Sequence, residues 1–289
     1  MASISDIRHH IQVVSQTRQI TNAMHMISTS KMQKSLQKFD ANRRYFQMVR
    51  GTMKDILTHS EEATHSYLLR PHGDRRVYIV IASDKGLAGS YNHDVLSLAS
   101  EHMLEHECNI MTVGQQAFNW FERRGDMVDI DFTSVMENGP SLDGARLIAE
   151  TVLELYEQDL LDEVYIVYTS MESALHNKPT VLHVLPVRAE DFDDVEIPHR
   201  DPYEIHYEPS PEAVMELLVP QYVIGMIYGT LLLSFASEQS SRINAMASAT
   251  RNADDLIGRL AVDMHRARQS AITNELAEII SGSEALEEL

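Results

Sequence analysis

The chain has 289 residues, is 44% hydrophobic and 23% charged, and carries a formal net charge of −19 at pH 7. This composition is typical of a globular protein and excludes a disordered or fibrous chain. The single cysteine, Cys108, excludes an internal disulfide, and residues 1–12 lack the apolar segment of a cleavable signal peptide. We therefore expect a cytoplasmic-type protein whose stability comes from burial.

The charge is distributed unevenly along the chain. Residues 1–60 have a balance of +6, residues 61–208 a balance of −19 and residues 209–289 a balance of −6. A basic N-terminal segment could bind nucleic acid. The acidic remainder of the chain would repel phosphate, so this class of partner is disfavoured.

A long helix is predicted from Ser3 to about Ser60, with Gly51 as the position where it could break. Its apolar line begins with residues at steps of three and four: Ile4, Ile7, Ile11 and Val14. The line continues more loosely through Met24, Ile27, Phe39, Phe46 and Val49. Such a narrow line is typical of a coiled-coil seam and not of a helix with a broad buried face.

The middle of the chain changes period. Buried strands are predicted at 77–83, 109–114 and 163–170, and helices at 93–106, 115–124 and 141–158. Strands that alternate with helices predict βαβ units and a mainly parallel sheet. A further strand at 180–187 follows a short polar turn, so we expect an antiparallel hairpin with 163–170. Residues 189–211 are predicted to form a long acidic loop.

Helix resumes at about Pro211 and continues nearly to the end, interrupted only by Pro220 and scattered glycines. Seventy-odd residues at 1.5 Å each would span roughly 100 Å. Its second half carries a line of apolar and small residues: Ala249, Ala253, Leu256, Leu260, Met264, Ala267 and Ala271. Their mean step is close to that of an eleven-residue repeat, which supercoils weakly or slightly right-handedly. Within this half, residues 265–280 show no broad apolar face.

The predicted fold is therefore α/β, with a long antiparallel coiled coil of the N- and C-terminal helices and a Rossmann-like domain with a mainly parallel sheet. The two end helices are basic and acidic, carry narrow seams, and are too long for a domain of that size to cover. We predict a coiled-coil helix at 1–60, the α/β domain at 61–208, and a C-terminal helix at 209–289 whose second half completes the coiled coil.

The segment SDKGLAGSYN (83–92) follows a strand and leads into a helix, where a phosphate-binding loop would lie. Gly86 and Gly89 are three residues apart, so neither the G-x-x-x-x-G-K-[ST] nor the G-x-G-x-x-G spacing is present. We expect a tight strand-to-helix turn. Because no catalytic set can be argued from the sequence either, we expect a chain that is not catalytic by itself and holds no cofactor.

Residues 217–237 carry no charge and contain Gly225 and Gly229, so a membrane span has to be considered. Pro220 lies inside the segment, and both flanks are glutamate, Glu216 and Glu238, with no basic residue to reach the interface. A helix buried against the sheet, with glycines that permit close approach, is favoured.

Fourteen histidines raise the possibility of a metal site. His9 and His10 are adjacent, and His102 and His106 have the i, i+4 spacing of zinc ligands on a helix. No third ligand at a recognisable spacing accompanies either pair, so no metal is predicted.

Five segments are similar to one known family. The segments RINAMASATRNADDLIGRL and RARQSAITNELAEIISG closely resemble the C-terminal signature of the gamma subunit of F-type ATP synthases. ITNAMHMISTSKM (20–32), SDKGLAGSYN and YGTLLLSFASEQSSR (228–242) resemble its N-terminal helix, first strand and turn, and start of the C-terminal helix. The segments occur in the family's order and span essentially the whole chain.

The resemblance implies a central-stalk rotor that couples ion flow, of H⁺ or Na⁺, to ATP synthesis or hydrolysis. The coiled coil would stand inside a ring of three alpha and three beta subunits, with the α/β domain beside the epsilon subunit and the membrane c-ring. The protein would then be peripheral to the cytoplasmic side of the plasma membrane. The resemblance also implies contacts with alpha and beta subunits at six residues: Met24, Arg242, Arg268, Gln269, Thr273 and Glu275.

This chain departs from the family pattern in places. Asn22 stands where the family usually has Lys, Gly282-Ser283 where it has Gly-Ala, and the middle domain is unusually acidic. A divergent or alternative gamma subunit fits these departures. A static coiled-coil adaptor that joins two partners without rotating is the other interpretation, since it also requires the antiparallel helix pair.

Overall fold

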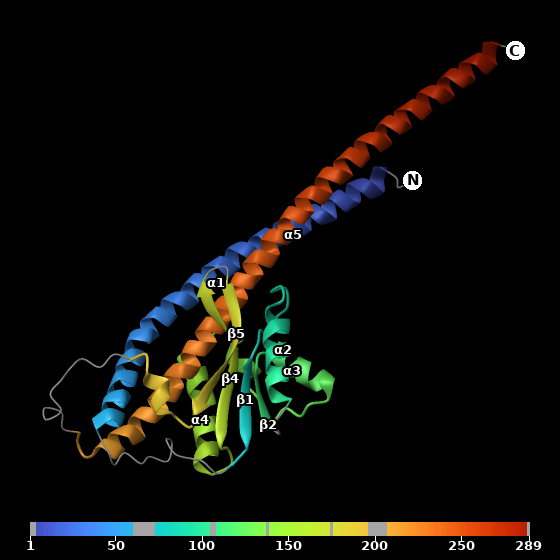
Figure 1. Cartoon of the computed structure of the whole chain (residues 1–289). Helices are drawn as coiled ribbons and strands as arrows, with labels where there is room; N and C mark the ends of the chain where they lie inside the picture. Colours follow the sequence, from blue (N-terminus) through green and yellow to red (C-terminus); the bar gives the residue numbers. More distant parts are fainter. Residues whose placement is uncertain are drawn as a thin grey trace. The chain divides into compact units, whose positions relative to one another are not determined.

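The computed structural model describes residues 4–59, 73–104, 108–136, 139–173, 176–195 and 207–287 (Figure 1). Its contacts divide the chain into two compact units. The helical-pair unit consists of Met1–Ile27 and Ile243–Leu289, and the α/β unit of Ser28–Arg242. The division predicted at 60/61 and 208/209 follows the elements of the sequence and stays a prediction; each long helix contributes to both contact units.

The two long helices are α1, Ile4–His59, and α5, Pro211–Glu287. Both are confirmed, and neither Gly51 nor Pro220 interrupts its helix. A proline in a helix removes the bond to the carbonyl four residues earlier. That carbonyl belongs to Glu216, which is exposed, so water can replace the missing donor.

In the helical-pair unit the N-terminal part of α1 pairs antiparallel with the C-terminal part of α5. Arg18 Nη1 lies 2.9 Å from Asp254 Oδ1, and the hydroxyls of Thr21 and Thr250 are 2.8 Å apart, so partner numbers fall as α1 advances. The first four positions of the predicted seam are buried or half-buried. The prediction is wrong at Ile27, which is 56% exposed.

The α/β unit contains a five-stranded sheet. Its strands are β1 Arg76–Ile81, β2 Cys108–Val113, β3 Ile130–Asp131, β4 Glu163–Ser173 and β5 His176–Leu185. The order is β3-β2-β1-β4-β5, with the first four parallel and β5 antiparallel to β4. The mainly parallel sheet and the hairpin are confirmed. The strand β3 was not predicted because it has only two residues.

The helices of this unit are α2 Tyr91–Met103, α3 Gln115–Arg124 and α4 Leu142–Glu157. Two short 3₁₀ helices, η1 Thr133–Met136 and η2 Ala189–Phe192, were not predicted. The second lies in the segment predicted as an acidic loop, most of whose remaining residues fall outside the described ranges. Ser141 caps α4 by accepting a hydrogen bond from the Gly144 amide at 3.1 Å.

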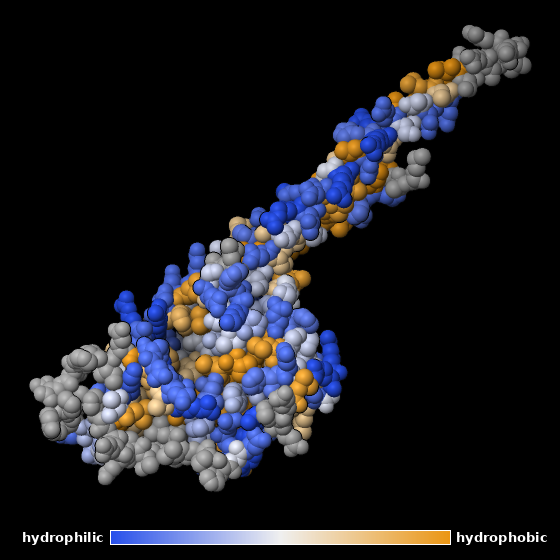
Figure 2. All heavy atoms as spheres, viewed as in Figure 1, coloured by the Kyte–Doolittle hydropathy of each residue, from blue (hydrophilic) through white to orange (hydrophobic). Residues whose placement is uncertain are grey.

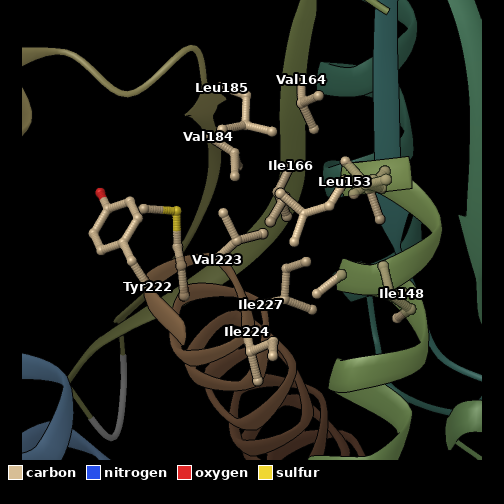
Figure 3. Close-up of a cluster of buried hydrophobic side chains, with 14 of the residues drawn as sticks. Ile148, Leu153, Val164, Ile166, Val184, Leu185, Tyr222, Val223, Ile224 and Ile227 are labelled. Carbon is tan, nitrogen blue, oxygen red and sulfur yellow. The ribbon is translucent and has the colours of Figure 1, made fainter. Parts of the chain in front are cut away.

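The sheet is covered on both faces, which gives three layers. Side chains of α2 and α3 pack with Tyr78 and Val80 on one face. On the other face, α4, the C-terminal end of α1 and the first part of α5 share one core with the strands. Figure 3 shows Val223 and Ile227 of α5 directed at Ile166 of β4. Burial on both faces explains why the strands read as continuous apolar runs.

The uncharged part of α5 is a core helix of this unit. Its most apolar window has a mean hydropathy of 1.6, long and apolar enough to cross a membrane by composition alone, but 61% of the window is buried inside the protein. The glycines permit close approach, as predicted, although to α1 and not to the sheet. A Cβ at Gly225 would lie 2.8 Å from Phe46 Cδ2, and one at Gly229 would lie 3.7 Å from Phe39 Cε2.

Candidate functional site

The natural ligand site of this fold lies at the carboxyl ends of β1 and β4. Open α/β sheets bind ligands in the crevice where neighbouring strands connect in opposite directions, and the order β3-β2-β1-β4 places that point between these two strands. Here α5 occupies the crevice. Ser237 Oγ donates to the carbonyl of Thr169 on β4 at 3.2 Å, and the Ser234 and Tyr91 hydroxyls lie 2.7 Å apart.

The segment 83–92 forms the predicted turn from β1 to α2. Ser83 Oγ donates to the Lys85 carbonyl at 2.8 Å, and the Ser83 amide donates to Asn92 Oδ1 at 3.0 Å. Leu87 and Gly89 have φ angles of 65° and 60°, in the left-handed region. These bonds hold the turn in a shape that offers backbone carbonyls to α5, where a phosphate-binding loop would offer amides.

Arg242 of α5 donates hydrogen bonds to those carbonyls. Its Nη2 donates to Lys85 O and Gly86 O, both at 3.1 Å, while Nη1 pairs with Glu238 Oε1 at 2.5 Å. Both side chains of the pair are 8% exposed. The planar guanidinium presents several donors in a fixed arrangement, so one side chain can bind three acceptors at once.

Burial raises the pKa of Glu238, and the charge of Arg242 opposes this rise. The carboxylate also accepts a bond from Gln239 Nε2 at 3.1 Å. A buried charge is costly unless it is paired and hydrogen-bonded. The pair therefore depends on both partners staying in place.

The β4–β5 hairpin holds the same turn of α5 from a second element. Asn177 Nδ2 on β5 donates to the Ser237 carbonyl at 3.2 Å and to Ser241 Oγ at 3.0 Å. We call the α5 residues that make these bonds, with the turn 83–92 and Asn177, the anchor; they are Ser234, Ser237, Glu238, Ser241 and Arg242. The anchor can fix a helix to a sheet, and it fills the crevice where the fold would hold a ligand.

The six predicted partner contacts lie in different surroundings. Arg268, Gln269, Thr273 and Glu275 are exposed on α5 in the helical-pair unit, and Met24 is half-buried on α1. Thr273 Oγ1 donates to the Gln269 carbonyl at 2.9 Å. This bond involves the backbone of Gln269 and not its side chain. Arg242 belongs to the α/β unit, is 7% exposed and serves the anchor. Contact of these six residues with other subunits stays a prediction.

The end of α5 is more apolar on its surface than the sequence analysis expected. Four residues at helical spacing are each about half exposed or more: Ile272, Leu276, Ile279 and Ile280. Figure 2 shows hydrophobic side chains gathered towards this end of the helix, whereas hydrophilic residues dominate the stretch before it. Contiguous exposed apolar side chains are typical of surfaces that bind a partner.

The histidines considered as zinc ligands have other surroundings. His102 Nδ1 lies 2.9 Å from the Tyr78 hydroxyl, a bond that places its ring against the sheet. His106 falls outside the described residues, and His9 and His10 are exposed on α1. Across the described ranges, no three His, Cys, Asp or Glu side chains are grouped so that they could hold a metal ion.

Sequence reasoning missed most of the anchor. Ser234, Ser237 and Ser241 were unremarkable small polar residues in an apolar helix. A signal was nevertheless present, because Glu238 and Arg242 are opposite charges at i, i+4 that directly follow an uncharged run of core helix. Two buried charges need partners: Glu238 pairs with Arg242 on the same helix, and Arg242 finds two further acceptors in the carbonyls of the motif 83–92.

Comparison with known proteins gives a consistent result. A family model described as ATP synthase matches residues 3–286. The ATP synthase gamma chain of Alkaliphilus metalliredigens is 39% identical over 285 residues, which are 98% of each chain, and that of Ruminiclostridium cellulolyticum is 37% identical over 99% of each.

Two solved structures share the fold. One, the central stalk and c-ring of the Tetrahymena thermophila mitochondrial ATP synthase, matches with a TM-score of 0.60 at 24% identity, over 80% of this chain and 99% of that chain. Another, from the Euglena gracilis mitochondrial ATP synthase, matches with a TM-score of 0.68 at 17% identity, over 98% and 94%. With the family model matched over almost the whole length, the chain belongs to the ATP synthase gamma chain family.

Proposed function

We propose that this chain is the central-stalk rotor of an F-type ATP synthase, which couples ion flow through the membrane sector to ATP synthesis or hydrolysis on the beta subunits. Membership of the gamma chain family carries the proposal. In this role the helical pair stands in a ring of three alpha and three beta subunits. The α/β unit contacts epsilon and the c-ring, and the protein is peripheral to the cytoplasmic side of the membrane.

Polar residues on the C-terminal part of α5 support rotation, although Ile20, Met26 and Val262 of the same unit are also exposed. Arg268, Gln269, Thr273 and Glu275 are polar and exposed. Each apolar side chain fully buried against the ring would deepen one angular well by about 1.5–3 kcal/mol, so a polar surface lowers the barrier to turning. The apolar line that begins at Ile272 is confined to the last described turns of α5, where we expect it to contact the surrounding ring.

The stoichiometry of the native complex tests the proposal. We expect native mass spectrometry of the complex isolated from membranes to find one copy of this chain with three alpha and three beta subunits. The second candidate, a static coiled-coil adaptor, has the same helix pair but favours a two-fold dimer. A dimer without alpha and beta subunits would therefore refute the rotor assignment.

We also propose that the chain is not catalytic by itself. Its own helix fills the crevice in which this fold binds nucleotides, through the contacts of Ser234, Ser237 and Arg242. Isothermal titration calorimetry of the purified chain with Mg-ATP should show no saturable heat at micromolar to millimolar nucleotide. Binding with a one-to-one endpoint would contradict this prediction, whatever the outcome of the stoichiometry experiment.

A further inference from the structure

We propose that the Glu238–Arg242 pair is the joint through which torque passes between α5 and the α/β unit, with both residues acting as positioning residues. The inference rests on the proposed rotor function. It gives a specific mechanical role to Arg242, which was predicted to contact another subunit, and to Glu238, which was noted only as a flank of the uncharged segment 217–237.

The position of the pair along the chain is the first observation. Arg242 is the last residue of the α/β unit, and Ile243 is the first residue of the second segment of the helical-pair unit. The helix continues without a break through both residues. A twisting force carried along α5 therefore enters the α/β unit at the turn that holds Glu238 and Arg242.

The geometry of the bonds is the second observation. Arg242 is fixed to its own helix through Glu238 and to the turn 83–92 through two carbonyls. Asn177 holds the same helical turn from the hairpin. Rotation of α5 about its axis would have to break bonds to two separate elements of the sheet. Glu238 and Arg242 are themselves buried, with side chains 8% exposed, so water cannot readily reach them to replace the bonds that break.

The contacts of α1 are the third observation. Near its first residues in the α/β unit, α1 bonds to α5, where Ser35 Oγ donates to the Leu232 carbonyl at 2.8 Å. Bonds from α1 to the segment after β5 occur further along, at Arg50 to Asp194 and at Lys54 to Val195. Force on α1 close to the unit boundary thus passes to α5, and the anchor transmits it to the sheet.

The variant Arg242→Lys tests the role of the joint separately from the general stability of the chain. Lysine keeps a positive charge beside Glu238 but lacks the planar fork that reaches Lys85 and Gly86. Arg251→Lys is the matched control, because Arg251 lies on the same helix, is exposed, and donates to Ser248 Oγ within that helix at 3.0 Å. Val223→Ala weakens the core of α5 without changing the anchor.

The experiment uses the complete complex of alpha, beta and this chain, with the ring fixed to a surface. A bead is attached to α4 through a biotinylated cysteine introduced as Glu150→Cys in a Cys108→Ser background. Two quantities are measured: the ATP hydrolysis rate, and the angular variance of the bead during catalytic pauses. The variance reports torsional stiffness between the ring and the α/β unit, which a merely structural residue would not change.

For Arg242→Lys we expect hydrolysis within about twofold of the parent and an angular variance about twofold larger. Arg251→Lys and Val223→Ala should leave the variance unchanged. If Arg242→Lys does not assemble, Asn177→Ala, which removes the hairpin bonds, should raise the variance instead. A parent-like variance in rotating complexes of either variant overturns the proposal. A parent bead that does not rotate contradicts the rotor function itself.

Discussion

Replacing Arg242 with leucine should lower the free energy of unfolding of the chain by about 3–5 kcal/mol, the usual cost of removing one partner from a buried ion pair. The variant leaves the Glu238 carboxylate buried without its cation and leaves the Lys85 and Gly86 carbonyls without their donor. Urea unfolding followed by circular dichroism measures the loss.

Two variants test the cause of that loss. Arg251→Leu, at an exposed position of the same helix, should change stability by only about 0.5 kcal/mol. Glu238→Leu combined with Arg242→Leu should recover much of the loss, because replacing a whole buried pair with apolar residues is often nearly neutral. A double variant as unstable as Arg242→Leu would show that the loss of stability comes from the Lys85 and Gly86 carbonyls and not from the unpaired Glu238 carboxylate.

The loss should also depend on pH. Burial raises the pKa of Glu238 in the folded chain and Arg242 opposes the rise, so leucine at position 242 raises this pKa further. A group whose pKa is higher in the folded state favours folding below its unfolded pKa, and that contribution is lost as the pH rises through the folded pKa. The loss in free energy of unfolding caused by Arg242→Leu should therefore be larger at about pH 7.5 than at about pH 5. An equal loss of stability at the two pH values would contradict this prediction.

Gly225→Ala should destabilise the chain by about 1–2 kcal/mol, although alanine is the better helix former. Its Cβ would lie 2.8 Å from Phe46 Cδ2, and the Phe46 ring is stacked on Tyr222 with centroids 5.4 Å apart. Overpacking typically costs about 1–3 kcal/mol, which outweighs the gain of about 1 kcal/mol in helix propensity. Urea unfolding gives the difference in stability.

The control is Gly229→Ala, one turn further along α5. Its Cβ would meet Phe39 Cε2 at 3.7 Å, an ordinary van der Waals distance. This variant should stabilise the chain by up to about 1 kcal/mol through helix propensity. Opposite signs for the two alanines would confirm that α1 and α5 touch at Gly225. A stabilising Gly225→Ala would contradict the packing described for that position.

Periodicity made most of the fold predictable. The two long helices, the four longer strands and the hairpin follow from runs of apolar residues at spacings typical of each element. The prediction failed where a local rule was overridden, as at Pro220, whose helix is held by packing of the residues around it. It also failed at β3, because two residues are too few to show a period.

The candidate site was less predictable, because burial of small polar residues depends on tertiary contacts. Thr21, Ser28 and Ser35 lie buried along α1 where an apolar seam was expected, while Ile27 faces solvent. A hydroxyl in such a position bonds to a neighbouring helix, as Thr21 does to Thr250, and its sequence looks like ordinary helix surface. The anchor was hidden for the same reason, since its serines become distinctive only once the turn 83–92 lies beside them.

The core that contains residues of both α1 and α5 also constrains the order in which the protein can fold during synthesis. The last strand of the sheet ends at Leu185, but the core on one face of that sheet also requires Met215 to Leu231 of α5. Ribosomes add about 5–20 residues per second, so each new chain spends seconds with that apolar face uncovered. Completion of this core must wait for sequence that lies past residue 211, and truncated chains that stop before it are expected to aggregate.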